Sequence, residues 1–320
     1  MQKIKSFFSS FSTRYLSSNR QVTRIIIFAV IALMLAVGSF AGYYWYDRYY
    51  SGQKTVKQLT IAEAEKAVVD DPSSLPKRLN LAEAYLVYQR YDDALAQANQ
   101  VFASDPTLDR AWLVMGVANA SNGHPADAIT PLTNYVNKYK DEEMAGLNKS
   151  LNSAAYFLGD SYLQLGKYKD AIDPLEKVVG WTQTDADAMY KLGMAYTGVG
   201  RYEDAVFMFQ FAVSFVPNFT ESYQGMATAY EKLNKPGLVD YANGMVAYSQ
   251  KDYPAGLKLL LKSAKAEPDF APVFAGLGLT YEAMGDLKNA KASYDTAVSI
   301  DPKNYTATRG VARVAVLLNK

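Results

Sequence analysis

The side chains that most often carry out enzymatic chemistry are scarce in this chain of 320 residues, which has no Cys and one His. The lack of Cys excludes disulfides, thiolate metal ligands, Cys nucleophiles and iron–sulfur clusters, and one His excludes any metal site or proton relay that needs two. That residue, His124, lies between Gly123 and Pro125, a sequence typical of a solvated turn. Phosphate-loop, GxSxG, HExxH and paired-carboxylate motifs are missing. We therefore expect no enzymatic activity, cofactor or metal.

The charges of the chain are balanced in total but unevenly distributed. There are 33 Lys and Arg residues against 32 Asp and Glu, and 49% of the residues are apolar, which suffices for a sizeable core. Nucleic acid is not an expected partner, because it requires a concentrated basic face. Residues 1–46 contain five cations and no acid, whereas the rest of the chain is net acidic. The two parts are thus expected to face different environments.

The stretch 25–46 has the composition of a transmembrane helix. It consists of 22 uncharged residues between Arg24 and Asp47 and ends in a cluster of Tyr and Trp. As a helix it would be about 33 Å long, enough to cross a hydrocarbon core of about 30 Å. The aromatic cluster suits the interfacial belt of a bilayer. We predict one N-terminal transmembrane helix.

The charge distribution also predicts an orientation in the membrane. Because the cations precede the helix, residues 1–24 are expected to form a basic cytoplasmic segment and the remainder to be extracytoplasmic, on the periplasmic side of a bacterial cell membrane. Two alternatives remain open. Residues 39–41, Ser-Phe-Ala, resemble a signal-peptidase site, and residues 1–24 are Ser-rich and acid-free, as in a mitochondrial presequence.

Two glycines in this stretch have the spacing of a helix-pairing motif. Gly38 and Gly42 form a GxxxG, which lets two helix backbones approach closely. They are candidate contacts for a helix–helix partner, although Gly and Ala are common in membrane helices for other reasons.

Beyond a juxtamembrane linker at 47–55, the sequence repeats. Residues 192–217 and 277–302 both read Leu-Gly, then Tyr three residues on, Gly four further, Ala five further, an aromatic four on, Ala three on and Pro five on. Paired apolar periodicities of helix length are separated by short turns that contain Gly or Asn. The pattern predicts helical hairpins.

This pattern resembles the tetratricopeptide repeat (TPR), a helix–turn–helix unit of about 34 residues. The resemblance covers residues 56–320 and implies an all-α fold, a right-handed α-solenoid. A small residue recurs in the first helix of each unit, and this small slot lets two helices pack closely. The slots are Ala82, Gly116, Gly159, Gly193, Ala227, Gly244, Gly278 and Ala312.

Two steps between small slots depart from the period. A nine-residue insertion at 141–149 predicts a longer loop or an extended helix. Between Ala227 and Gly244 the step is only half a repeat, so either one helix is missing or one helix serves two roles, and the superhelix should change direction at a seam near residue 236. Lone helices at 56–72 and 304–318 are expected to cap the two ends.

The resemblance also implies a binding surface, because the first helices of such repeats line the concave face. The candidate residues for a protein-binding groove are Leu79, Leu113, Val117, Tyr156, Asp160, Leu163, Tyr190 and Met194. Tyr156 and Tyr190 occupy equivalent positions, Asp160 gives a negative edge, and Lys191 and Arg110 are isolated cations. This stripe favours an apolar or weakly basic segment as ligand. The alternative is that these residues contact only neighbouring helices.

These features predict a membrane-anchored scaffold that binds other membrane or envelope proteins as an assembly factor or chaperone-like adaptor. A permanent accessory subunit of a large membrane complex is a second hypothesis. A cytosol-facing organelle import receptor is a third, which the cations before the apolar stretch disfavour.

Overall fold

The computed structural model describes residues 29, 31–42 and 56–318, which belong to two compact units, 1–63 and 64–320. In the first unit, residues 31–42 are helical and their side chains are exposed. A Cβ added at Gly38 or Gly42 would meet no neighbour within 4 Å. No helix within the described ranges is both long and apolar enough to cross a membrane. The rest of the stretch 25–46 lies outside the described residues, apart from residue 29.

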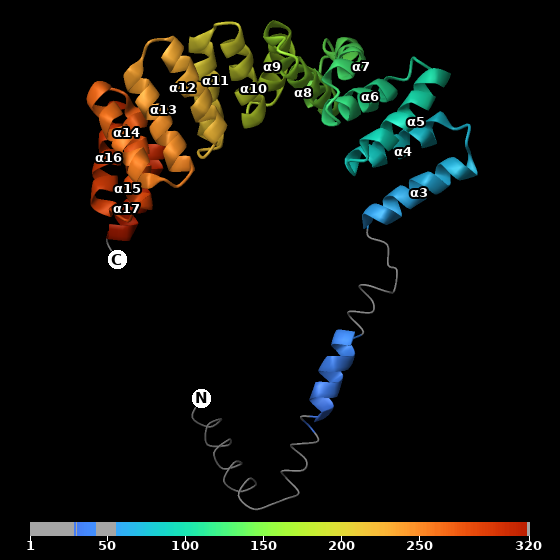
Figure 1. Cartoon of the computed structure of the whole chain (residues 1–320), viewed down its shortest axis with the longest axis horizontal. Coiled ribbons are helices and arrows are strands. Elements are labelled where there is room, and N and C mark those ends of the chain that lie inside the picture. Colours follow the sequence, from blue (N-terminus) through green and yellow to red (C-terminus); the bar gives the residue numbers. More distant parts are fainter. Residues whose placement is uncertain (1–28, 30, 43–55, 319–320) are drawn as a thin grey trace, which may run out of the picture. The chain divides into compact units, whose positions relative to one another are not determined.

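Residues 56–318 contain sixteen helices and no strand, so the prediction of an all-α solenoid of helical hairpins is confirmed for this part of the chain (Figure 1). The helices are α3 (Val56–Asp70), α4 (Leu75–Val87), α5 (Tyr91–Ser104), α6 (Asp109–Ser121), α7 (Pro125–Tyr139), η1 (Ala145–Leu147), α8 (Lys149–Gln164), α9 (Tyr168–Trp181), α10 (Ala186–Gly198), α11 (Tyr202–Phe215), α12 (Thr220–Lys232), α13 (Pro236–Ser249), α14 (Tyr253–Ala266), α15 (Ala271–Ala283), α16 (Leu287–Ile300) and α17 (Tyr305–Leu318).

The turn inside each hairpin closes with a residue in the left-handed region. Glycine supplies it at Gly123, Gly166, Gly200 and Gly285, with φ between 69° and 81°. Glycine adopts this conformation at no steric cost, which explains the periodic Gly of the sequence. Asn234 takes the same role between α12 and α13 with φ 53°.

The small slots that are glycine face a large side chain of the second helix of their own hairpin. A Cβ on Gly116 would lie 2.4 Å from Leu132 Cγ, and one on Gly193 would lie 2.6 Å from the ring of Phe209. The close approach predicted at these glycines is therefore confirmed. In both hairpins the side chain that fills the space lies one turn after an alanine of the second helix, Ala128 or Ala205.

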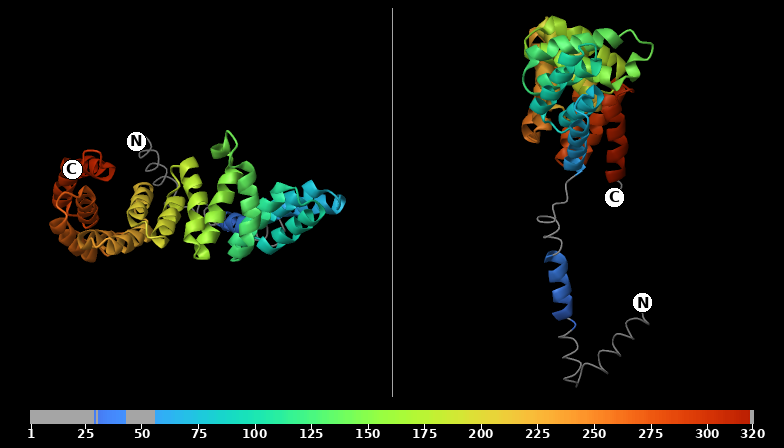
Figure 2. Two further views of the ribbon diagram at one scale, coloured as in Figure 1. Left: turned by 90° about the horizontal axis from the view of Figure 1, so that it is seen from above. Right: turned by 90° about the vertical axis from the view of Figure 1, so that its right-hand side faces the viewer.

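Both departures from the period have definite structures. The insertion at 141–149 is a loop with the short helix η1, not an extension of α7. At the half repeat no helix is missing, because α13 packs as a second helix against α12 and as a first helix against α14. Seen from above, the helices after this seam turn back more tightly than those before it (Figure 2, left).

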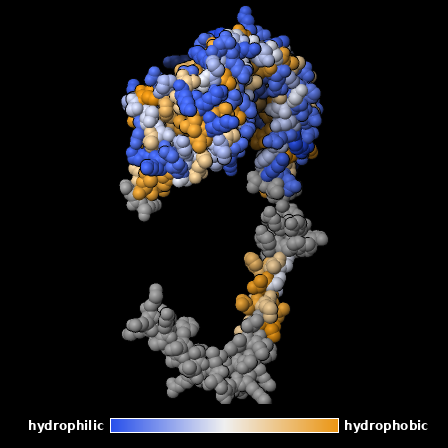
Figure 3. Space-filling view, turned by 60° about the vertical axis from the view of Figure 1, so that its left-hand side comes forward, coloured by the Kyte–Doolittle hydropathy of each residue, from blue (hydrophilic) through white to orange (hydrophobic). Residues whose placement is uncertain are grey.

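The first helices lie on the inner side of this curved unit. Successive first helices contact one another (α4 with α6, α6 with α8, α8 with α10 and α10 with α12), whereas second helices make at most marginal contact with one another. Elements on the inside of a curve are closer together, so the first helices form the concave wall. Apolar side chains also reach the surface of the unit in patches among hydrophilic ones (Figure 3).

Candidate functional site

The structure places the predicted groove residues on α4, α6, α8 and α10, with very different accessibility. Met194 is exposed, whereas Leu113, Val117 and Leu163 are half-buried and pack against the core. Leu79 is only 3% exposed and packs with Val101 and Ala111. Its side chain belongs to the core and does not face a groove.

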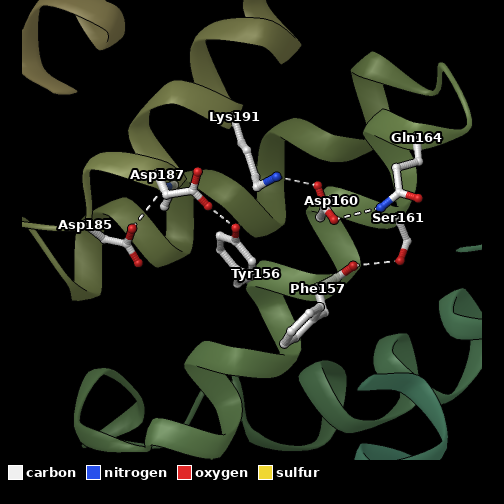
Figure 4. A network of polar contacts seen from close by, with 9 residues as sticks. Tyr156, Phe157, Asp160, Ser161, Gln164, Asp185, Asp187 and Lys191 are labelled. Atoms are coloured by element: carbon white, nitrogen blue, oxygen red, sulfur yellow. Dashed lines mark hydrogen bonds and ion pairs between the residues drawn. The ribbon is translucent and has the colours of Figure 1, made fainter. Parts of the chain in front are cut away.

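Tyr156, on α8, lies at the centre of a polar network that joins α8 to α10 (Figure 4). Its hydroxyl donates a hydrogen bond to the Asp187 carboxylate, and the ammonium of Lys191 lies 5.5 Å from the centre of its ring. Burial and the bond to Asp187 raise the pKa of the Tyr156 hydroxyl well above its ordinary value. The phenol therefore stays protonated and acts as a donor.

Asp160, one turn after Tyr156, does not provide the free negative edge that the sequence suggested. Lys191 Nζ lies 2.6 Å from its Oδ1, and both side chains are less than 20% exposed. Gln164 donates to the other carboxylate oxygen at 2.8 Å. Because Lys191 neutralises Asp160, this pair adds no net charge to the wall.

Tyr190 occupies the repeat position of Tyr156 but has a different environment. Its ring packs against those of Phe209 and Phe219, with centroid distances of 5.9 and 5.1 Å. Burial raises the pKa of its hydroxyl. The two tyrosines are thus equivalent in register, while only Tyr156 takes part in the α8–α10 polar network.

A cavity of about 440 Å³ lies beside Tyr156, between α8 and the start of α10. Its walls carry Lys149, Asn152 and Thr182 together with the carboxylates Asp185 and Asp187. Asp185 is already engaged, because it accepts a hydrogen bond from the backbone amide of Ala188 and caps α10. The wall thus combines an aromatic face with polar side chains, which suits a peptide backbone with one apolar side chain.

Ion pairs between successive first helices escaped the sequence analysis. Arg110 on α6 binds both carboxylate oxygens of Glu83 on α4, at 2.9 and 2.8 Å, so neither Arg110 nor Lys191 is isolated. Arg313 on α17 binds Glu282 on α15 in the same way, at 2.6 and 2.7 Å. The signal was a separation of opposite charges by nearly one repeat: 31 residues for Lys191 with Asp160 and for Arg313 with Glu282.

Comparison with protein families identifies the repeats. Two models described as tetratricopeptide repeat match, one over residues 79–137 and 158–210 and the other over residues 271–304. The TPR resemblance is thereby confirmed for these segments, and such repeats are protein-interaction scaffolds. No curated protein matches this chain.

Several solved structures are similar in fold. A crystal structure of MamA is 26% identical, with a TM-score of 0.44, and the match covers 58% of this chain and 97% of that one. MamA MSR-1 is 21% identical, with a TM-score of 0.48, over 55% of this chain and 95% of that one. The Cut9–Hcn1 hetero-tetramer of APC/C matches over 81% of this chain and 46% of that one, at 19% identity and a TM-score of 0.42.

Proposed function

We propose that this chain of tetratricopeptide repeats is a membrane-anchored scaffold whose concave wall binds a segment of another protein. The observation that carries the proposal is the accessible surface around Tyr156. There, an aromatic face, the exposed Met194 and a cavity of about 440 Å³ lie on neighbouring first helices. Aromatic side chains over apolar surface are typical of residues that dominate binding energy at interfaces.

The expected ligand is an apolar or weakly polar peptide segment. Two carboxylates of the first helices are neutralised by cations, Glu83 by Arg110 and Asp160 by Lys191, whereas Asp187 is bound by the uncharged hydroxyl of Tyr156. A strongly charged ligand would gain little from such a wall, whereas an apolar side chain can displace water from the ring of Tyr156. The scaffold would act as an assembly factor for membrane or envelope proteins.

The anchor part of the proposal rests on the stretch 25–46 and the five cations before it. Among the described residues of this stretch, Leu33, Leu35 and Phe40 are more than 60% exposed. Exposed apolar side chains at this density are unfavourable in water and favourable in a bilayer, where Gly38 and Gly42 could pair with another helix.

Binding is tested by truncating both groove tyrosines. Tyr156→Ala with Tyr190→Ala is expected to weaken partner co-purification about 10³-fold, if each loss is about 2 kcal/mol and the losses add. The matched control is Phe207→Ala with Phe211→Ala, which removes two exposed rings from the second helix α11. Met194→Lys adds a second groove variant that leaves the aromatic packing intact. Thermal melts of each variant separate lost binding from lost folding.

The result that contradicts the groove is full partner retention by folded tyrosine and Met194 variants. If only the α11 control variant lost partner binding, the binding surface would instead be the outer face of the repeats.

Orientation is tested by a reporter fused after Lys320. A reporter that works only outside the cytoplasm should be active, because the cations precede the apolar stretch. Activity of a cytoplasm-dependent reporter instead would refute the extracytoplasmic placement.

A further inference from the structure

A second cavity lies at the half-repeat seam, away from the groove around Tyr156. It has a volume of about 330 Å³, is open to solvent on one side, and is lined by residues of α11, α12, α13 and α15 and by the turn before α17. Ligand cavities in proteins begin at about this size. Its walls are largely apolar and include Val213, Met245 and Leu279.

The cavity lies where three positions of the repeat carry smaller or less polar residues than the equivalent positions near Tyr156. Tyr241 precedes its small slot Gly244 by three residues, as Tyr156 precedes Gly159. Asp187, Tyr190 and Lys191 lie on α10, the first helix that follows Tyr156. The equivalent positions on α15, which follows Tyr241 in the same way, are Pro272, Ala275 and Gly276. Those three small or apolar residues all line the cavity. The carboxylate, the ring and the lysine that lie near Tyr156 therefore have no counterparts near Tyr241. Met245 takes up the space beside Gly276, and the rings of Phe270 and Tyr223 pack edge-on against Tyr241.

The hydroxyl of Tyr241 has no hydrogen-bond partner among the described residues, although the side chain is only 5% exposed. Its neighbours differ in this respect. Tyr223 donates to the carbonyl of Pro217 at 3.2 Å, and Tyr230 accepts from Gln210 at 3.1 Å. Among the described residues, the fully buried side-chain polar atoms without a partner belong to Trp112, Thr133 and Ser222. The Tyr241 hydroxyl is not one of them, so it keeps some solvent access and can donate to water or to a ligand in the cavity.

The mouth of the cavity carries one cation and no carboxylate. Lys303 lies on its rim and makes no ion pair with a described residue, and the first turn of α17, Tyr305 and Thr306, forms part of the wall. The N-terminus of α17 is already capped, because the amide of Ala307 donates to Asn304 Oδ1 at 2.9 Å, so Lys303 is the group at the rim that favours an anion. No Asp or Glu lines the cavity. The nearby Asp301 is engaged, because it accepts from the backbone amide of Lys303 at 2.9 Å.

We propose that this seam cavity binds an apolar group, aromatic or branched aliphatic, that ends in a carboxylate. The apolar part would occupy the space between Met245 and Ala275, and the carboxylate would accept a hydrogen bond from Tyr241 or lie at the rim near Lys303. Two sources share this chemistry: a small free acid and the C-terminal residue of a polypeptide. The site is separate from the groove, so it does not depend on the groove being the main binding surface.

The test measures the binding of three probes to the full chain by ligand-observed NMR. The probes are 3-phenylpropionate, its neutral amide and the peptide Gly-Gly-Phe with a free carboxylate. We expect the acid to bind at least about fivefold more tightly than the amide, because a hydrogen bond to a charged group is the stronger one. Tighter binding of the peptide than of the acid would identify a polypeptide end as ligand, and the reverse order a small acid.

Three variants locate the probe. Tyr241→Phe is expected to weaken acid binding about tenfold by removing the donor, and Lys303→Gln roughly threefold, because its charge is exposed. Ala275→Leu should abolish binding by filling the cavity. The matched control is Lys288→Gln, an exposed cation on α16 outside the cavity, which should change nothing.

Three outcomes would overturn the proposal: no binding of acid or peptide up to about 10 mM, equal binding of acid and amide, or unchanged binding by both Tyr241→Phe and Lys303→Gln. Because these two variants remove single polar groups, they keep the test valid if Ala275→Leu fails to fold.

Discussion

Tyr156 and Tyr241 occupy the same position of the repeat and have opposite surroundings. The hydroxyl of Tyr156 donates to Asp187, 31 residues later on the next first helix, and Lys191 lies over its ring. For Tyr241 the residue 31 positions later is Pro272, whose side chain has no atom that can accept a hydrogen bond. Both tyrosines line a cavity, but only Tyr156 meets a carboxylate there. The repeat therefore fixes the position of a side chain on its helix, while the next repeat decides whether its hydroxyl finds a partner.

The difference also shows how a solenoid can carry two kinds of surface. Where consecutive repeats supply complementary charges, as with Asp160 and Lys191, side chains of the two helices pair with each other, and the neighbouring cavity has polar walls. Where the half repeat brings small residues such as Ala275 and Gly276 beside Tyr241, the wall opens into a cavity. Loss of half a repeat thus changes the chemistry of the wall as well as its direction.

The largest effect should come from the small slot of α10, where Gly193 faces the ring of Phe209 between the two regions along the chain. Gly193→Leu is expected to destabilise the repeats by about 3 kcal/mol or more, because a Cβ there already lies 2.6 Å from Phe209. That ring is also confined by Gly225, where a Cβ would lie 2.5 Å away, so it has little room to move. Thermal or denaturant melts of the chain measure the change.

The control for this change is Gly180→Leu, at an exposed helical glycine with no neighbour within 4 Å of an added Cβ. It should be neutral or slightly stabilising, since Leu is the better helix former. Equal destabilisation by the two changes would refute the packing role of the slot.

A smaller effect separates the two tyrosines directly. Tyr156→Phe should cost about 1 kcal/mol, because it breaks a hydrogen bond to a carboxylate, whereas Tyr241→Phe should stay within about 0.5 kcal/mol of the original chain, because it removes a hydroxyl without a partner. Chemical denaturation of the two variants gives both values. If Tyr241→Phe proved the more costly change, the contrast between the two regions would be wrong.

The smallest effect concerns pH and the last ion pair of the array. Hydrogen bonds from Arg313 hold the pKa of Glu282 below its ordinary value. Glu282 therefore stabilises the fold above the pKa of the unfolded state, about 4.3, and this stabilisation is lost as the pH falls through the lower folded value.

Arg313→Met should accordingly cost no more than about 1 kcal/mol at pH 7, since Arg313 is half exposed. The difference between variant and original chain should shrink as the pH falls from about 5 to 3. A difference that stays constant over this range, measured by denaturation at each pH, would show that the pair does not act through the Glu282 charge.

The sequence by itself determined the helices, their pairing and their close contacts. A period of 34 residues with a small slot at Gly159 and Gly193 requires helical hairpins that pack at those points, because a larger side chain would collide with the facing helix. The seam was visible too, as a half-period step between Ala227 and Gly244.

The tertiary structure alone decided which side chains of the wall are available. Leu79 and Tyr156 occupy the same register, yet one is core and the other is half exposed. The sequence alone suggests that Asp160 is a free charge, whereas in the structure α10 places Lys191 beside it. Availability depends on the neighbouring repeat, about 31 residues away, and on the curvature that brings the two helices together. A periodic pattern specifies each helix face, but only the packed array specifies what that face meets.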